Sequence, residues 1–229
     1  MSLHGNKVGV VFCWLLACVA GASAAAQTQS AYDLVQDTTV RVMDVVAAAD
    51  KYVDNDPERY YQQIQDLLDP LIDFRGFARK VMGPYASSDR YRSLDEGGRK
   101  QLRDQLDRFT SVMRSSLVRT YSKGLLAFGG SRIELVPPRE SDSSAAEDTD
   151  NSRLSLRQLI FADRKQPYEV MYQMGQEKTG EWKLRNVIIE SVNLGEIYRD
   201  QFLASAREQN GNLDAVIDNW TTVVVDVEK

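Results

Sequence analysis

Apolar residues in the first half of the chain recur every three or four positions, which is the spacing of one face of an α-helix. The first such stripe consists of Leu34, Thr38, Val42, Val45 and Ala49. Polar and charged residues occupy most of the positions between them. We therefore expect an amphipathic helix here, with one face directed toward a core.

Two shorter helices are predicted next, and Asp and Pro mark where they begin and end. Asp56-Pro57 predicts the start of the first, with Asp as N-cap and Pro in the first turn, and Asp69-Pro70 follows its end. Asp73 is the predicted cap of the second. We expect that helix to run to Met82 and to stop at Gly83-Pro84.

The longest predicted helix begins at residues 93–96, where Ser93-Leu94-Asp95-Glu96 has the pattern of a capping box. Gly97-Gly98 weakens its first turn by about 1 kcal/mol per glycine relative to Ala, and Gly129-Gly130 ends it. Its apolar stripe keeps helical spacing and consists of Leu102, Leu106, Phe109, Met113, Leu117, Tyr121 and Phe128.

Beyond residue 130 the apolar period changes to two, which predicts β-strands. Apolar residues alternate over 133–135, 154–160 and 168–174, and a further strand is expected over 182–192. The run Val187-Ile188-Ile189 is continuous, so this strand carries a bulge or is buried on both faces. Short connections such as 177–180 make the strands antiparallel hairpins.

Helices, then an antiparallel sheet, then further helices make an α+β pattern. We expect a helix-rich N-terminal half that wraps a curved, roughly four-stranded antiparallel sheet, with C-terminal helices over 194–208 and from 212 to about 223. Such a shape encloses an apolar cavity, which is filled by side chains or holds a ligand. Residues 139–151 contain five acidic residues and little apolar area, which predicts a mobile loop or an acidic docking arm.

The first 26 residues have the pattern of a cleaved export signal. A short basic start at 1–7 precedes an apolar run of about thirteen residues, too short to span a bilayer, and A-x-A cleavage sites follow at 22–24 and 24–26. Removing these 26 of the 229 residues leaves 203, Gln27 to Lys229, which suit a single domain. Leu15-Leu16-Ala17-Cys18 also resembles a lipobox, which would instead make Cys18 a lipidated N-terminus.

The only His and both Cys lie in the first 18 residues, so the expected mature chain has neither. This excludes a Ser-His-Asp triad, a Cys nucleophile, a disulfide, and zinc or haem sites built on imidazole or thiolate. Because Lys7 is the only charged residue in the signal, the mature chain keeps 27 Lys and Arg against 33 Asp and Glu, a net charge of −6. That balance disfavours nucleic-acid binding, which needs a broad basic face.

Three stretches of the chain resemble a known family. They are residues 73–83 (DFRGFARKVMG), residues 117–122 (LVRTYS, continuing to Leu125-Leu126) and residues 180–202 (GEWKLRNVIIESVNLGEIYRDQF), of which the last is the most specific. In this order they resemble MlaC, the periplasmic phospholipid-binding component of the Mla (maintenance of lipid asymmetry) system, also called the toluene-tolerance auxiliary family. The resemblance covers roughly residues 31–217.

The resemblance implies a soluble periplasmic shuttle that carries phospholipid between two membrane complexes. One is an outer-membrane lipoprotein–porin complex, and the other is an inner-membrane ABC transporter with an MCE-domain subunit. It also implies that acyl chains lie in the apolar cavity, with the head group near its mouth. The chain departs from the family pattern by the insert at 139–151, by Asn186 and Ser191 where Asp and Gly are expected, and by Gly124 and Gly195.

With this resemblance, seventeen apolar and tyrosine residues become candidates for lining a lipid cavity, and ordinary core packing is the alternative for them. They are Val81, Met82, Tyr85, Phe109, Val112, Met113, Leu117, Tyr121, Leu135, Leu156, Val170, Tyr172, Met174, Val187, Ile189, Tyr198 and Phe202. The candidates for head-group binding or docking are Arg75, Arg79, Lys80 and Arg199. A solvated face is the alternative for the first three, and an ion pair with a carboxylate is the alternative for Arg199.

Two other classes of function stay open from the sequence. One is an enzyme with Glu190 as general base beside Tyr172, which requires a carboxylate with a strongly raised pKa. The other is an adaptor protein with a filled core. For the carrier we expect bound phospholipid as cargo, no other cofactor, no metal, and a monomer.

Overall fold

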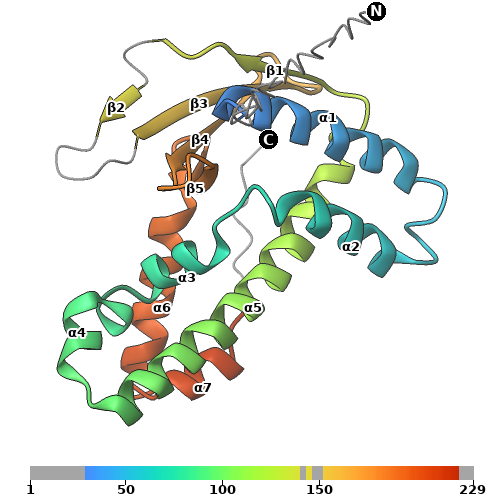
Figure 1. Cartoon of the computed structure of the whole chain (residues 1–229). Helices are drawn as coiled ribbons and strands as arrows, with labels where there is room; N and C mark the ends of the chain where they lie inside the picture. Colours follow the sequence, from blue (N-terminus) through green and yellow to red (C-terminus); the bar gives the residue numbers. More distant parts are fainter. Residues whose placement is uncertain (1–28, 140–142, 146–151, 222–229) are drawn as a thin grey trace, which may run out of the picture.

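Figure 1 shows the computed structural model, which describes residues 29–139, 143–145 and 152–221. The predicted signal at 1–26, with its cleavage sites and Cys18, lies outside the described residues. Helices precede and follow an antiparallel sheet, so the predicted α+β class is confirmed. The sheet lies at one end of the molecule, the first helix lies along it, and the later helices extend away from it (Figure 1).

The first three helices begin and end close to where the sequence predicts. They are α1 (Ala31–Ala49), α2 (Pro57–Leu68) and α3 (Phe74–Met82). Asp56 and Asp73 cap α2 and α3, and each carboxylate accepts a hydrogen bond from the backbone N–H three residues later. The predicted caps are therefore confirmed, because each satisfies a backbone donor that the helix leaves unpaired.

The start of the long helix differs from the prediction. Two short elements that we did not predict, η1 (Gly83–Ala86) and α4 (Ser88–Ser93), precede α5 (Glu96–Leu126). Asp95, and not Ser93, is the N-cap of α5, and its Oδ1 accepts from the Gly98 N–H over 2.7 Å. Ser93 instead ends α4, where its hydroxyl donates to the Arg90 carbonyl over 2.7 Å. The predicted capping box was therefore wrong. Ser and Asp are both good N-caps, and Ser93 is already the last residue of α4.

The sheet has six strand segments, against the roughly four that we expected. They are β1 (Arg132–Val136), β2 (Ser143–Ala145), β3 (Ser152–Phe161), β4 (Tyr168–Gln176), β5 (Trp182–Ile189) and β6 (Val192–Asn193). The order is β1-β3-β4-β5-β6, all pairs are antiparallel, and β2 pairs with β3. β2 belongs to the predicted mobile loop at 139–151, of which Arg139 and β2 are described; the remainder lies outside the described residues.

β5 carries a bulge and ends earlier than predicted. Its register against β4 shifts between Gln173 and Met174, which makes Arg185 the extra residue on β5. The chain then turns at Glu190 and Ser191, whose φ angles are 49° and 72°. A tight hairpin turn of this kind favours Gly, the residue that we expected from the resemblance at position 191. The predicted strand to residue 192 was therefore too long by this turn.

One face of the sheet, the inner face, carries the alternating apolar residues. On β3 and β4 it consists of Leu154, Leu156, Gln158, Ile160, Tyr168, Val170, Tyr172 and Met174, paired across the two strands. α1 lies on this face. The Tyr32 hydroxyl donates to the Leu135 carbonyl over 3.1 Å, and Gln158 Nε2 donates to Thr39 Oγ1 over 3.0 Å.

The two C-terminal helices are α6 (Leu194–Glu208) and α7 (Leu213–Asp218). The bounds predicted for α6 are confirmed. α7 ends at Asp218, earlier than the predicted residue 223, and residues from 222 on lie outside the described part of the chain.

Three apolar clusters form the core. The helix cluster joins α3, α5, α6 and α7, and in it the Phe109 ring centroid lies 4.9 Å from Phe202 and 5.0 Å from Trp220. The sheet cluster joins α1 to the inner face through residues such as Val35 and Leu156. The hairpin cluster joins α1, α2 and the middle of α5 around Tyr60. Each cluster excludes water from one junction between elements, which is the main favourable term in folding.

The helices are tied to the sheet at β5. The Leu184 N–H donates to the Leu71 carbonyl over 2.8 Å, and the Asp73 N–H donates to the Leu184 carbonyl over 3.2 Å. The Asp73 carboxylate accepts from the Gly76 N–H over 2.9 Å and forms an ion pair with Arg185. Both side chains of this pair are less than a third exposed, at 22% and 30%. One carboxylate therefore begins α3 and also holds it against the bulge of β5.

We expect Asp73→Ala to lower the free energy of unfolding by about 2 kcal/mol, since it removes a helix cap and the partner of a half-buried guanidinium. Asp73→Asn keeps a capping oxygen, so it should lose roughly half as much. Urea denaturation measures both. Asp66→Ala on the exposed side of α2 is the control, and equal losses at the two sites would contradict the proposed tie.

Candidate functional site

The structure divides the seventeen predicted lining residues by burial. Ten are almost fully buried within the core. They are Val81, Met82, Phe109, Met113, Leu135, Leu156, Val170, Met174, Tyr198 and Phe202. They pack as core residues do, and their role as lining residues stays a prediction.

The other seven lining candidates keep part of their surface accessible. Tyr85 and Val112 lie at the outer side of the helix cluster. The remaining five come from the two walls that face each other, α5 and the inner face of the sheet. We call these five the inner seam: Leu117, Tyr121, Tyr172, Val187 and Ile189.

The inner seam lies where the three clusters meet. Val187 packs against both the helix cluster and the sheet cluster, and Leu117 packs against both the helix cluster and the hairpin cluster. Tyr172 is the partner of Val187 across β4 and β5. The seam therefore brings together residues from β4, β5 and α5 that are distant in the sequence.

The tyrosines of the seam have fixed hydroxyl partners. The Tyr121 hydroxyl lies 2.8 Å from that of Tyr198, and the Tyr172 hydroxyl donates to Gln158 Oε1 over 2.7 Å. Burial raises the pKa of Tyr121, Tyr172 and Tyr198, so all three are neutral at physiological pH. Although its hydroxyl is buried, the Tyr172 side chain keeps part of its surface accessible. The seam thus presents uncharged surface from satisfied side chains.

Sequence reasoning missed two residues of this junction. Leu68 and Ile72 each pack against both the sheet cluster and the hairpin cluster, and Ile72 also bridges to Leu184 of β5. They flank Asp69-Pro70, which we interpreted as the end of a helix and nothing more. Apolar residues on both sides of that turn were the available signal.

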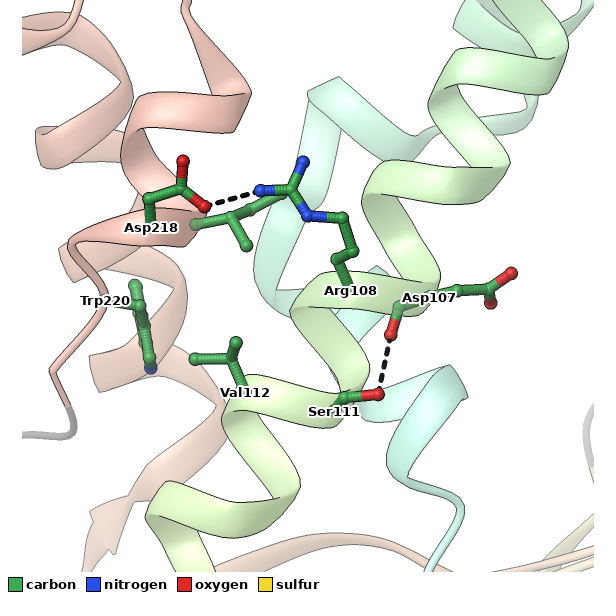
Figure 2. A pocket seen from close by; sticks show the side chains of 7 residues that line it. Asp107, Arg108, Ser111, Val112, Asp218 and Trp220 are labelled. Carbon is green, nitrogen blue, oxygen red and sulfur yellow. Dashed lines mark hydrogen bonds and ion pairs between the residues drawn. The ribbon is translucent and has the colours of Figure 1, made fainter.

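The described residues do not show the enclosed apolar cavity that we expected. One hollow is a surface groove of about 580 Å³ between α5 and α7, with Val112, Ile217 and Trp220 among its lining (Figure 2). Its one basic residue, Arg108, is already paired, because it lies 2.5 Å from both Asp214 and Asp218. This groove includes Val112 and none of the inner seam.

The four predicted head-group or docking residues fall into two groups. Arg75 forms an exposed ion pair with Asp107 of α5, and such surface pairs contribute little stability. Arg79, Lys80 and Arg199 are exposed and have no ion pair within the described part of the chain. The carboxylate partner that we considered for Arg199 is therefore not found among those residues.

The acid–base pair considered for an enzyme is not assembled. The Glu190 carboxylate accepts from the Glu169 N–H over 2.5 Å and lies 2.9 Å from the Arg164 guanidinium. Burial raises the pKa of Glu190, but these two partners outweigh it and hold the pKa below its usual range. A general base at this place requires the opposite shift, and the Tyr172 hydroxyl is bonded to Gln158 instead.

The described residues offer neither a metal site nor a membrane-spanning helix. Across 29–139, 143–145 and 152–221, no cluster of three His, Cys, Asp or Glu side chains is placed to bind a metal ion. In the same part of the chain no helix has the length and apolar character needed to cross a membrane.

Comparison with known proteins shows what this chain is similar to. The family model described as "MlaC protein" matches residues 36–222. The toluene tolerance protein ttg2D of Pseudomonas putida is 32% identical over 208 residues, which cover 90% of this chain and 86% of that protein. A phospholipid-binding protein of Ralstonia solanacearum, solved in complex with a phospholipid, has a TM-score of 0.64 at 18% identity and covers 83% of this chain and 94% of its own. That structural likeness shows a shared fold.

The seam tyrosines predict how stability depends on pH. A Tyr whose pKa is raised in the folded protein contributes stability below its unfolded pKa of about 10, and loses it as the pH rises through the folded value. We therefore expect the free energy of unfolding to fall above about pH 10, and Tyr172→Phe to flatten this fall. Urea denaturation at several alkaline pH values measures the slope. Tyr91→Phe on the surface should leave it unchanged, and an equal effect of both substitutions would contradict the burial of Tyr172.

Proposed function

The chain belongs to the MlaC protein family, and on this premise we propose that it is a periplasmic carrier of phospholipid. The shared fold with a phospholipid-binding protein that was solved with its lipid supports the proposal. The acyl chains would lie along the inner seam, between α5 and the inner face of the sheet, and the head group would lie near the opening.

The observation that carries the proposal is the accessible surface of the seam. Five apolar or tyrosine side chains on two facing walls stay partly uncovered where three packed clusters meet. The Tyr172 side chain keeps accessible surface, yet the protein around its hydroxyl raises the pKa of that group. The accessible surface of Tyr172 therefore lies in a recess and not on the open exterior. Uncovered apolar surface of this kind is typical of a ligand-binding groove.

The energetics of a carrier require a near balance with the membrane. Each methylene removed from water contributes about 0.8 kcal/mol, so a sixteen-carbon chain contributes roughly 12 kcal/mol. The protein has to provide a dry site of similar depth, or lipid will not leave the bilayer; a much deeper site would not release it. Flexible side chains such as Met113 and Met174 behind the seam can repack around chains of different shape.

We also propose the setting of this carrier. The signal pattern at 1–26 would direct the chain to the periplasm, where it would act as a monomer. Family membership supports exchange with an outer-membrane lipoprotein–porin complex and an inner-membrane ABC transporter with an MCE-domain subunit. Phospholipid would be its cargo and not a cofactor in a reaction.

An adaptor with a filled core is the second candidate. The ten buried lining candidates favour it, because they form continuous packed clusters in the described structure. The two candidates differ in one measurable property, which is whether the purified protein contains lipid.

We expect the purified mature protein to carry phospholipid in near-stoichiometric amount. Native mass spectrometry gives the mass of the complex, and organic extraction followed by lipid analysis identifies the cargo. Protein that is free of lipid and takes up none from phosphatidylethanolamine–phosphatidylglycerol vesicles would establish the adaptor alternative instead.

We expect Val187→Arg to reduce lipid loading at least tenfold, because a charge on the seam makes burial of an acyl chain unfavourable by several kcal/mol. Val40→Arg is the matched control, since Val40 lies on α1 with 54% of its surface exposed. Loading is measured by native mass spectrometry after incubation with vesicles, and circular dichroism confirms the fold.

Val187→Trp is the second variant for this site, because it fills the seam without adding a charge and covers the case in which the Arg variant does not fold. It should also lower loading. If both Val187 variants fold and load lipid as the Val40 control does, the seam is not where the chains bind.

A further inference from the structure

Three cationic side chains at the junction of α3, α6 and the sheet have no ion-pair partner among the residues that the structure describes. Lys80 belongs to α3, Arg153 to β3 and Arg199 to α6. Within the described part of the chain none of them forms an ion pair or a hydrogen bond through its side chain. The protein as a whole is negatively charged. Three cations placed together without ion-pair partners among the described residues repel one another, and a bound anion would offset this repulsion.

The geometry of α3 directs Lys80 toward this junction. Gly76 and Lys80 are four residues apart in α3, so they share one face of the helix. A Cβ atom at Gly76 would lie 3.2 Å from Arg185 Nη1, and one at Gly83, the residue that follows α3, would lie 3.4 Å from Arg199 Nε. The face that carries Lys80 therefore looks toward Arg185 of β5, and Arg199 of α6 lies at the C-terminal end of the same helix.

Arg153 reaches the same place from the sheet. It pairs in register with Gly175 of β4, and a Cβ atom at Gly175 would lie 3.1 Å from Arg185 Nε. Arg185 thus lies between Gly76 of α3 and Gly175 of the sheet. In agreement with this geometry, the pKa of Lys80 is lowered, first by burial and then by the charge of Arg153.

The described acidic side chains around the junction either pair with Arg185 or lie too far away to pair with the three cations. Asp73 and Glu177 both pair with Arg185, so these three side chains together carry one net negative charge. Glu196 and Asp200 of α6 lie next to Arg199 in sequence and are exposed, but neither is within ion-pair distance of Lys80, Arg153 or Arg199. The described acidic groups therefore offset at most one of the three positive charges of Lys80, Arg153 and Arg199, and a net positive charge remains at the junction.

We propose that Lys80, Arg153 and Arg199 form a binding site for a phosphate group. Two guanidinium groups and one ammonium group supply donors that match the oxygens of a phosphate, and the charge repulsion between them is relieved when an anion binds. The phosphate belongs either to a lipid head group or to a small soluble phosphate. The first of these sources rests on the proposed carrier function, whereas the site itself does not.

The test uses the lipid-depleted mature protein and two soluble probes, inorganic phosphate and glycerol 3-phosphate. We expect amide NMR signals of residues 80, 153 and 199 to shift and to saturate with either probe, beyond the change produced by chloride at the same ionic strength. In Lys80→Gln/Arg153→Gln the apparent affinity should fall about tenfold or more. Lys123→Gln/Arg41→Gln is the matched control, since it removes the same charges from exposed positions of α5 and α1.

Three outcomes would overturn the site: shifts that chloride reproduces, shifts at other residues, or equal losses in the variant and in the control. Addition of phosphate should also raise the pKa of Lys80, because the bound anion favours the ammonium form. A pKa that does not change with phosphate would contradict the site as well.

A second arm identifies the source of the phosphate. Lipid loading from phosphatidylglycerol vesicles is compared between the wild type and Lys80→Gln/Arg153→Gln. A loss of loading assigns the site to the lipid head group, and unchanged loading with lost phosphate shifts assigns it to a soluble phosphate. If no form of the protein loads lipid while the phosphate shifts persist, the carrier function fails and the phosphate site stands.

Discussion

The attachment of the helices to β5 is the constraint on which the rest of the structure depends. Backbone bonds from Leu71 and Asp73 to Leu184, together with the Asp73–Arg185 pair, fix α3 against this strand. α6 begins directly after β6, which pairs with β5. The distance between α5 and the inner face of the sheet, and with it the width of the inner seam, therefore follows from one strand.

In this arrangement apolar residues of similar chemistry occupy two different environments. Phe109 and Phe202 are covered on all sides and stabilise the helix cluster, whereas Leu117 and Val187 face a boundary between clusters and stay half-buried. Stability thus comes from the clusters, and the boundary between them is where we propose that the acyl chains lie. A site on such a boundary can be widened without breaking the hydrogen bonds inside any element.

The sequence was sufficient where local chemistry decides the outcome. Asp56 and Asp73 cap their helices because their carboxylates need only reach three residues ahead, and alternation assigned the inner face of β3 and β4. The prediction failed at Ser93, because this residue ends α4 and its hydroxyl bonds within that helix instead of capping α5. The sequence placed Tyr172 on one face of the sheet but did not reveal its hydrogen-bond partner Gln158. It also gave no signal for Arg153. Burial and charge environment depend on elements that are distant in the sequence and meet only in the folded protein.

The two-residue turn at Glu190 and Ser191 leaves almost no slack between the sheet and the last long helix. Asn193, the second residue of β6, is also the N-cap of α6, so strand and helix share one rigid joint. Val187 lies on β5 and Arg199 lies on α6. The turn and the two residues of β6 are all that separate the strand that carries Val187 from the helix that carries Arg199.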